Sequence, residues 1–215
     1  MNKAFIFDFD GVIIDNEPLW EEAKKELYQN VFGKEVFARM GSTLGINMDD
    51  IYNMAVRCGT TVEKDLFIKE FHNQAPVIYK TAPITPGIDS VGDKLVALGY
   101  EIAIVSASPR EWIETTLERT KLKNHITHIL SLYDRKDLPH KPAPDGYLEA
   151  MKSLNVSPLK TVILEDSNTG IESAKASGAY TIGFKQNLMK GYVQKNADAY
   201  ADDLEEVIKL LEKIS

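Results

Sequence analysis

The sequence predicts an α/β protein built on a doubly wound parallel sheet, with an α-helical segment inserted near its beginning. Two observations predict this fold. Short apolar runs alternate with helical patterns along most of the 215-residue chain, and this alternation stops between roughly residues 17 and 80. Alternating strands and helices are typical of βαβ units, whose parallel strands are buried on both faces. A chain of this length has room for a core with a modest insertion, and the interrupted pattern favours that organisation.

The predicted core strands are short apolar runs that end at polar residues. They are Ala4 to Phe7, Ile102 to Val105, Thr161 to Leu164 and Thr181 to Phe184, with the stretch around Ile129 and Leu130 as a further candidate. The first three runs are followed by Asp8, by Ser106, and by Glu165 with Asp166. Ligands of open α/β sheets bind beyond the carboxyl ends of the strands. We therefore expect these polar residues to form the functional site.

Helical patterns fill the intervals between the strands, over Ile88 to Leu98, Arg110 to Thr120, Asp145 to Leu154 and Thr169 to Ser177. Ser167 is placed to cap the last of these helices, because its hydroxyl can accept a hydrogen bond from a free N–H group. Gly178 is placed to end the same helix, since glycine tolerates a positive φ. The acidic run from Asp202 to Glu206 predicts the start of a final helix, where the helix dipole favours negative charge.

The inserted segment contains helical patterns and no convincing strand. The patterns extend over Leu19 to Val31, Met48 to Cys58 and Val62 to Tyr79. Prolines and a glycine between Thr81 and Gly87 indicate where the chain re-enters the core. We therefore expect a catalytic core made of residues 1–16 and 81–215, and a helical cap made of residues 17–80.

Composition excludes several classes of protein. With 44% hydrophobic and 27% charged residues, the chain has enough apolar side chains for a buried core. A net charge of −7 and the lack of a dense Lys/Arg run argue against a nucleic-acid partner, although a small anion could still bind beside a metal ion or a lysine. Cys58 is the only cysteine, and no apolar run is long enough for a signal segment or a membrane span. We expect a cytoplasmic monomer with no membrane partner.

Two acidic pairs predict a metal site. Asp8 and Asp10 follow the first strand, and Glu165 and Asp166 follow a later one. If the pairs converge at one edge of the sheet, they repel each other unless a cation lies between them. Oxygen ligands that leave room for water and substrate suit Mg²⁺ better than zinc or copper. Taken alone, Asp8 and Asp10 have a simpler interpretation as a polar strand end followed by a helix cap.

Two further residues are candidates for binding a phosphate. Lys141 lies in a proline-stiffened loop before a helix, and its alternative interpretation is a solvated surface lysine. Ser106 lies between a strand and a helix, where its hydroxyl and nearby free N–H groups could bind an anion; the alternative is a simple helix cap. The four histidines share no ligand spacing and are interpreted as surface or structural residues.

As an ordered set, these residues resemble the motifs of the haloacid dehalogenase superfamily, in particular its β-phosphoglucomutase-like phosphatases. Asp8 to Asp15 matches the first motif, Ser106 the second, Lys141 with its Lys-Pro-x-Pro context the third, and Glu165 to Gly170 the fourth. The resemblance extends over essentially the whole core. It implies that the insertion after the first motif is an α-helical cap, and an aspartate at each of positions 8 and 10 favours phosphoryl transfer over dehalogenation.

The resemblance implies a mechanism for these positions. Asp8 would attack phosphorus and form a phospho-aspartate, and Asp10 would protonate the leaving oxygen and then activate water. Mg²⁺ would be held by Asp8, the backbone carbonyl of Asp10, Asp166 and, more variably, Glu165. The phosphate oxygens would be bound by Lys141, Ser106, and backbone N–H groups near Phe9, Asp10 and Ala107.

The same resemblance favours the hydrolysis of small phosphorylated metabolites such as sugar phosphates. In the mutases, a histidine or similar polar group twelve residues after the nucleophile helps to recognise the sugar phosphate, whereas this chain has Trp20 there. The run from Asp15 to Leu19 is closer to the pattern of the sugar phosphatases, with Asn16 in place of a serine. Asn16, Trp20 and Arg39 are the expected substrate contacts outside the core motifs.

Three alternative functions remain open. The first is a β-phosphoglucomutase-type mutase, and the second is a phosphate-sensing signalling domain that also uses an acidic cluster with a Ser/Thr and a Lys. The long insertion after the first strand argues against this signalling domain. The third is a catalytically inactive binding module, against which the retention of every candidate catalytic residue argues.

Overall fold

The computed structural model of the chain describes residues 3–41, 43 and 48–214. In chain order, its helices and strands are β1 (Lys3–Phe7), α1 (Glu17–Phe32), α2 (Lys34–Met40), α3 (Met48–Arg57), α4 (Lys64–Thr81), α5 (Ile88–Ala97), β2 (Tyr100–Ser106), α6 (Arg110–Leu117), the 3-10 helix η1 (Leu122–Asn124), β3 (Ile126–Ser131), α7 (Asp145–Ser153), the 3-10 helix η2 (Pro158–Lys160), β4 (Thr161–Glu165), α8 (Asn168–Ala176), β5 (Tyr180–Phe184), β6 (Ala199–Ala201) and α9 (Leu204–Ile214). None of the helices in these residues has the length and apolar character needed to cross a membrane.

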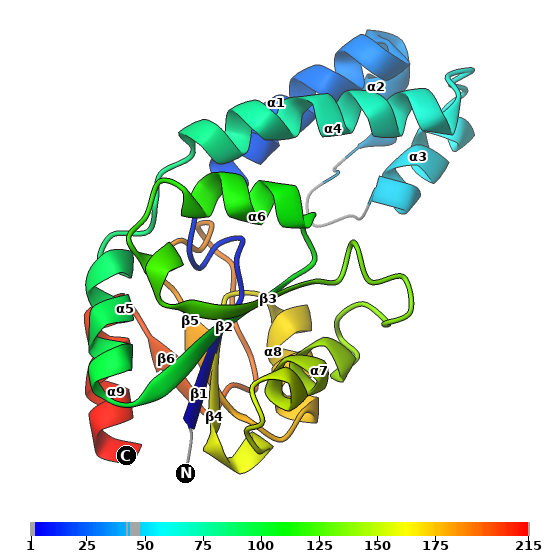
Figure 1. Cartoon of the computed structure of the whole chain (residues 1–215). Coiled ribbons are helices and arrows are strands. Elements are labelled where there is room, and N and C mark those ends of the chain that lie inside the picture. Colours follow the sequence, from blue (N-terminus) through cyan, green and yellow to red (C-terminus); the bar gives the residue numbers. More distant parts are fainter. Residues whose placement is uncertain (1–2, 42, 44–47, 215) are drawn as a thin grey trace. The chain divides into compact units, whose positions relative to one another are not determined.

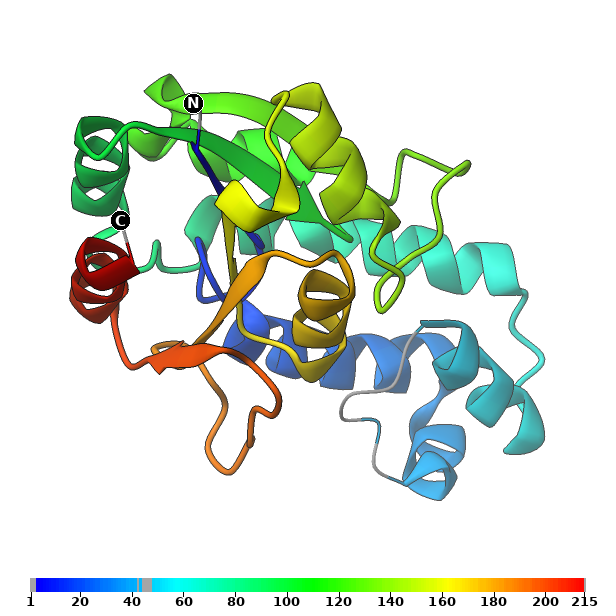
Figure 2. The same ribbon diagram turned by 90° about the horizontal axis from the view of Figure 1, so that it is seen from below.

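The core is a six-stranded sheet in the order β3-β2-β1-β4-β5-β6, in which every neighbouring pair is parallel. Helices α5 and α9 cover one face of the sheet, and α7 and α8 cover the other (Figures 1 and 2). The strand order reverses at β1, whose neighbours are β2 on one side and β4 on the other. The predicted doubly wound α/β fold is therefore confirmed, and β1 ends at the switch point where such folds bind ligands.

The packing explains why the central strands are nearly continuous apolar runs. Ala4 and Ile6 of β1 contribute to a buried cluster with side chains of β2, β4, α7 and α8, and Phe5 and Phe7 are also fully buried. A strand covered by helices on both faces has no side chain that must face water, so apolar and polar residues do not alternate.

Local signals in the sequence position the later helices correctly. The Ser167 hydroxyl caps α8 by accepting a hydrogen bond from the N–H of Gly170 at 2.9 Å, and Gly178 follows the helix with a φ of 82°. Asp203 lies at the start of α9, where its carboxylate accepts a hydrogen bond from the N–H of Glu206 at 2.8 Å. These predicted helix ends are confirmed.

Besides the short 3-10 helices η1 and η2, two elements were not predicted, the strand β6 and the helix α2. The three-residue strand β6 carries the sequence Ala-Tyr-Ala, which is too short to show a periodic pattern. Helix α2 has seven residues and lies between Gly33 and Gly41, whose φ angles are 87° and 75°. The predicted strand around Ile129 and Leu130 is present and longer than expected, as β3.

Contacts divide the chain into two compact units, one made of residues 1–15 and 82–215 and the other of residues 16–81. Helices α1 to α4 make up the second unit. Its interior is aromatic: the rings of Phe32 and Phe67 lie 4.9 Å apart, and Trp20 stacks on Phe71 at 4.6 Å. The residues predicted to form a cap therefore bury a hydrophobic core of their own.

The two chain segments that lead to and from residues 16–81 are neighbours within the first unit. Ile14 and Ile84 form an antiparallel bridge. The N–H of Asp15 donates to the carbonyl of Pro83 at 2.9 Å, and the N–H of Thr85 donates to the carbonyl of Ile13 at 3.0 Å. The insertion thus begins and ends at one hydrogen-bonded pair of segments.

Candidate active site

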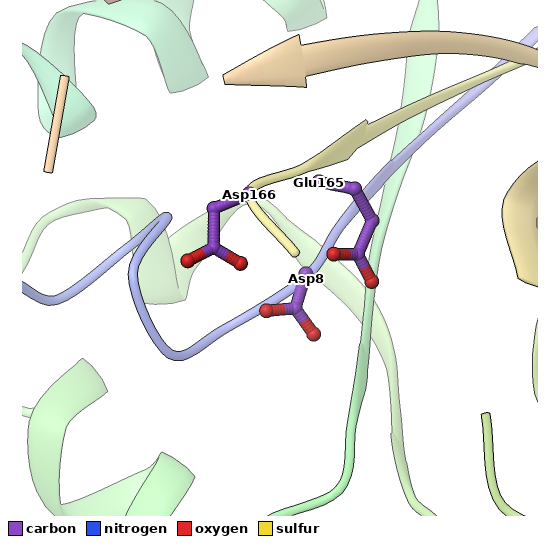
Figure 3. Close-up of side chains that lie close together, drawn as sticks. All are labelled: Asp8, Glu165 and Asp166. Atoms are coloured by element: carbon purple, nitrogen blue, oxygen red, sulfur yellow. The ribbon is translucent and has the colours of Figure 1, made fainter. Parts of the chain in front are cut away.

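Three carboxylates converge at the carboxyl ends of β1 and β4. Asp8 follows β1, Glu165 is the last residue of β4, and Asp166 follows it; one oxygen from each lies within 4.8 Å of the others (Figure 3). The two strands are adjacent and parallel, and the N–H of Asp8 donates to the carbonyl of Leu164 at 2.9 Å. The pairing of these strands therefore brings together acidic residues that are more than 150 positions apart in the sequence.

Lys141 lies against two of these carboxylates. Its Nζ is 2.5 Å from Oδ1 of Asp8 and 2.6 Å from Oε1 of Glu165, and its side chain is only 10% exposed. The loop that carries Lys141 is fastened to α8, because the Ser173 hydroxyl donates to the carbonyl of Ala143 at 2.7 Å. The alternative interpretation of Lys141 as a solvated surface lysine is wrong.

Burial and mutual repulsion perturb the acidic cluster. Burial raises the pKa of Asp8 to about 8, with the Glu165 carboxylate as the next cause and the nearby Lys141 ammonium opposing both. Burial followed by the charge of Asp8 also raises the pKa of Asp166. Burial disfavours the charged form of Lys141, but the carboxylates of Asp8 and Glu165 outweigh this effect and raise its pKa. One ammonium therefore does not neutralise three converging carboxylates.

The chemistry of the cluster fits a divalent cation with oxygen ligands. A cation would relieve the repulsion that raises these pKa values, and an all-carboxylate set of donors suits Mg²⁺. The backbone also approaches closely here: a Cβ added to Gly11 would lie 2.0 Å from Oδ2 of Asp166, and Gly11 has a φ of 75°. The glycine after Asp10 is thus required both by the turn and by the proximity of Asp166.

Asp10 has different partners from Asp8. Its Oδ2 accepts a hydrogen bond from the Ser108 hydroxyl at 2.6 Å and a long one from the Ser106 hydroxyl at 3.5 Å. The N–H of Ser108 donates to Oγ of Ser106 at 2.9 Å, and the Ser131 hydroxyl holds the carbonyl of Ser108 at 2.8 Å. Ser108 was not predicted as a site residue, although it stands two positions after Ser106 in the same loop.

Glu165 is fully buried and surrounded by donors from the chain itself. Its carboxylate accepts hydrogen bonds from Lys141, from the Tyr147 hydroxyl at 2.6 Å, and from the N–H and hydroxyl of Ser167 at 3.3 and 3.2 Å. A Cβ added to Gly170 would lie 1.9 Å from Oε1 of Glu165. These contacts hold Glu165 where it can orient Lys141. Its predicted contact with a metal ion stays a prediction.

Tyr147 and Asn187 also belong to the site and were missed. Tyr147 lies on α7, six residues after Lys141, and a single tyrosine in a helical pattern is ordinarily a core residue. Asn187 donates from its side-chain amide to the carbonyl of Gly11 at 3.1 Å and to the Thr85 hydroxyl at 2.7 Å. Nothing in the local sequence indicates that the segment after β5 returns to the first motif.

The remaining predicted residues lie as follows. Phe9 is fully buried, its carbonyl accepting a hydrogen bond from the N–H of Ile13 at 2.8 Å, and Ala107 is exposed in the loop after β2. Asn16, Trp20 and Arg39 belong to the unit of residues 16–81. Asn16 and Trp20 are buried, whereas Arg39 is exposed and donates from Nε to the carbonyl of Glu35 at 3.2 Å. Their predicted roles in substrate binding stay predictions.

Comparison with characterised proteins identifies relatives among phosphatases. The chain is 29% identical over 180 residues to hexitol phosphatase B of Escherichia coli strain K12, covering 81% of this chain and 79% of the relative. It is 27% identical over 218 residues to a phosphorylated carbohydrates phosphatase of Thermotoga maritima, covering 99% of both chains.

Solved structures have the same fold. The β-phosphoglucomutase of Clostridium difficile superposes with a TM-score of 0.75 at 24% identity, covering 99% of this chain and 96% of that one. CbbY of Rhodobacter sphaeroides, solved in complex with phosphate, superposes with a TM-score of 0.74 at 20% identity and 96% coverage of both chains.

The family model described as haloacid dehalogenase-like hydrolase matches residues 5–184, a range that contains all four predicted motifs. This confirms the resemblance that the motifs predicted. The chain belongs to the haloacid dehalogenase-like hydrolases and is an enzyme of that family.

Proposed function

We propose that this enzyme is a phosphatase that hydrolyses monoesters of small phosphorylated metabolites, such as sugar phosphates, through a phospho-aspartate on Asp8. The observation that carries the proposal is the different environment of the two aspartates of the first motif. Asp8 is buried against Lys141 and two further carboxylates, whereas Asp10 is held by the hydroxyl of Ser108. The names of the phosphatase relatives support the same reaction and substrate class.

In the first half of the reaction, a carboxylate oxygen of Asp8 attacks phosphorus. A bond forms between that oxygen and phosphorus, and the bond between phosphorus and the ester oxygen breaks. Asp10, in its protonated form, gives its proton to the departing oxygen, so the metabolite leaves as an alcohol. Lys141 and the Ser106 hydroxyl neutralise and orient the phosphoryl oxygens, and such positioning contributes much of the acceleration.

In the second half, water hydrolyses the phospho-aspartate. The Asp10 carboxylate takes a proton from the water as its oxygen bonds to phosphorus, and the bond between phosphorus and the Asp8 oxygen breaks. Inorganic phosphate leaves, Asp8 is again a carboxylate, and Asp10 is again protonated. The hydrogen bond from Ser108 keeps the Asp10 carboxyl group in one orientation for both transfers.

A magnesium ion would be held by Asp8, Asp166 and the backbone carbonyl of Asp10, with Glu165 beside it. When bound, Mg²⁺ would neutralise negative charge on the carboxylates and on the phosphoryl group. The support for this assignment is the oxygen-only donor set and the raised pKa values of Asp8 and Asp166.

The unit of residues 16–81 is the proposed cap, which selects the substrate. The residues gathered at the carboxyl ends of β1, β2 and β4 suit a phosphate and a metal ion, and they offer little to distinguish one leaving alcohol from another. Recognition of the leaving group therefore requires further residues. Asn16 and Trp20 are candidates from the motif comparison, and Arg39 is a candidate as a cationic residue of the proposed cap. Closure of the cap would also exclude water and so strengthen the interactions of the phosphoryl group with Lys141 and the metal ion.

A substrate panel tests the proposal. Purified enzyme with Mg²⁺ is incubated with hexose phosphates, hexitol phosphates, glycerol phosphate, phosphoglycolate, nucleoside monophosphates and pyrophosphate, and released phosphate is measured. We expect the best substrate among the sugar and polyol phosphates, and no release from any compound by the Asp8→Asn variant. Circular dichroism verifies that this variant is folded. Phosphate release by Asp8→Asn would disprove the assignment of the nucleophile, and isomerisation of a hexose phosphate without release would indicate a mutase.

A further inference from the structure

The segment after β5 returns to the acidic cluster through a single glutamine. Nε2 of Gln194 donates to the carbonyl of Asp166 at 2.6 Å and to the carbonyl of Phe184 at 2.8 Å, and it lies 3.4 Å from the carbonyl of Glu165. Three carbonyl oxygens around one atom require that atom to be the amide nitrogen, since an oxygen could donate to none of them. The orientation of the carboxamide is therefore fixed by its surroundings.

The carboxamide of Gln194 lies where the hydrogen-bonded ladder between β4 and β5 ends. Glu165 and Gly183 are the last paired residues of β4 and β5, so the ladder ends immediately before Asp166. The Asp166 carbonyl lies beyond this ladder, so its hydrogen bond must come from another group. The amide nitrogen of Gln194 donates this hydrogen bond, and the same nitrogen also donates to the carbonyl of Phe184 on the neighbouring strand.

The fold makes room for Gln194 and fastens its loop. A Cβ added to Gly183 would lie 2.7 Å from Cδ1 of Tyr200 and 2.9 Å from Oε1 of Gln194, so a larger residue there would crowd both side chains. At the start of α8, the Asn168 side chain donates to the carbonyl of Val193 at 3.0 Å and accepts from the N–H of Lys195 at 2.8 Å. The residues on both sides of Gln194 are therefore hydrogen-bonded through their backbone to Asn168, at the start of the helix that follows Asp166.

The carboxamide oxygen of Gln194 makes no hydrogen bonds comparable to those of the nitrogen. Its Oε1 is buried and has no hydrogen-bond partner among the residues that the structure describes. An unpaired buried acceptor is unfavourable, whereas the amide nitrogen of the same side chain contacts three carbonyls. The hydrogen bonds of the nitrogen therefore determine the position of this side chain.

We propose that Gln194 is a positioning residue for the metal site, whose carboxamide fixes the backbone of Asp166 relative to the end of β5. The inference rests on the proposed function, because it takes Asp166 as a metal ligand. A residue that binds a metal is oriented by the groups that hydrogen-bond to it. Loss of such a group typically weakens metal affinity by about 10–100-fold. Gln194 would act through Asp166 and would touch neither metal nor substrate.

The test measures metal binding without turnover. Binding of Mn²⁺ alone is followed by electron paramagnetic resonance for the wild type, Gln194→Met, Gln194→Asn and Asp166→Asn, at a temperature well below each unfolding midpoint. Gln186→Met is the matched control, because Gln186 belongs to the same loop. Within the part of the chain that the structure describes, Gln186 makes no hydrogen bond to the acidic residues. We expect both Gln194 variants to bind Mn²⁺ about tenfold more weakly, and the control to bind it as the wild type does.

The outcomes separate this inference from the proposed function. If the wild type does not bind Mn²⁺, or if Asp166→Asn binds it normally, the metal site itself is wrong. If Asp166→Asn loses affinity while Gln194→Met and Gln194→Asn keep it, Gln194 has no positioning role and the inference is overturned. A lower unfolding midpoint with unchanged Mn²⁺ affinity would show a purely structural role and would overturn it equally. If Gln194→Met does not fold, Gln194→Asn decides the matter, because it keeps a neutral carboxamide on a shorter side chain.

Discussion

Two aspartates two positions apart acquire different properties from their neighbours. Asp8 lies beside an ammonium and two carboxylates, and its pKa is raised to about 8 by burial and by Glu165. Asp10 instead accepts a hydrogen bond from the Ser108 hydroxyl. The proposed nucleophilic role of Asp8 requires its ionised form, which a cation bound beside it would favour.

The effect of metal on stability should depend on pH. Without metal the folded state binds the proton of Asp8 more tightly than the unfolded state does, so this carboxyl stabilises the fold below pH 3.8, and that contribution is lost as the pH rises towards about 8. Metal binding needs deprotonated ligands. At about 100 times its dissociation constant, Mg²⁺ should add about 2.7 kcal/mol, or roughly 5–11 °C in the unfolding midpoint, at alkaline pH.

Differential scanning fluorimetry with Mg²⁺ or EDTA at about pH 8 and about pH 5 measures this effect. We expect a clearly smaller shift at the lower pH, where protons compete with the metal. Comparing the two additions at one pH cancels the contributions of ionisable groups far from the site. Equal shifts at both values would contradict the prediction.

At the scale of single elements, the active site is assembled where strands end and helices begin. Helix α8 illustrates this arrangement, since its cap Ser167 also donates to Glu165 and its third residue, Gly170, packs against the same carboxylate. The start of this helix is therefore fixed both by its own capping and by the position of Glu165.

Replacing Gly170 by alanine should impair both stability and catalysis. Alanine is favoured over glycine within a helix by about 1 kcal/mol, but the new Cβ would lie 1.9 to 2.1 Å from the Glu165 carboxylate. Either α8 or Glu165 must move, and Glu165 orients Lys141 through a 2.6 Å contact. Because small displacements of catalytic groups can lower rates about a hundredfold, we expect kcat to fall by that order.

Gly92→Ala provides the comparison for this variant. A Cβ at Gly92 of α5 would lie 2.8 Å from Cδ1 of Leu122, so this variant should also lose stability. It should keep a normal kcat, because the crowded atoms belong to the hydrophobic packing of α5. Steady-state kinetics and thermal unfolding of both variants distinguish the two effects. A normal kcat in Gly170→Ala would show that Glu165 tolerates displacement.

The sequence was most informative where an element has a strong local signal. The apolar runs before Asp8 and Glu165 predicted β1 and β4, and the convergence of their acidic residues followed from the edge that parallel strands share. Ser108, Tyr147 and Gln194 lay beyond this reasoning, because each contacts the site through a partner distant in sequence: Asp10, Glu165 and Asp166. Such contacts depend on tertiary packing, which a local pattern does not specify.

At the scale of the whole molecule, chemistry and substrate choice are proposed to reside in different units. The acidic cluster with Lys141 belongs to the unit of residues 1–15 and 82–215, and Trp20 and Arg39 belong to the unit of residues 16–81. Each unit has a buried core of its own. Substitutions in one unit can therefore be made without disturbing the interior of the other.

Substitutions in the two units should have different kinetic consequences. Arg39→Ala and Trp20→Phe, which retains a ring to stack on Phe71, should change the order of preferred substrates while the best substrate is still hydrolysed. Lys141→Ala and Asp166→Asn should lower kcat/KM for every substrate together, because these residues serve only phosphate and metal. The measurement is kcat/KM across the substrate panel. A uniform loss in the cap variants, or a reordered panel in the core variants, would contradict the division.

The antiparallel bridge between Ile14 and Ile84 has an evolutionary consequence. Because the chain leaves and re-enters through hydrogen-bonded neighbours, the whole of residues 16–81 is topologically a loop whose ends are already closed. Lengthening such a loop adds little entropic penalty, about 0.6 kcal/mol for each doubling of its length. Descendants of this gene could therefore exchange, shorten or extend that segment and acquire new substrates, while the strand order and the phosphoryl chemistry are inherited unchanged.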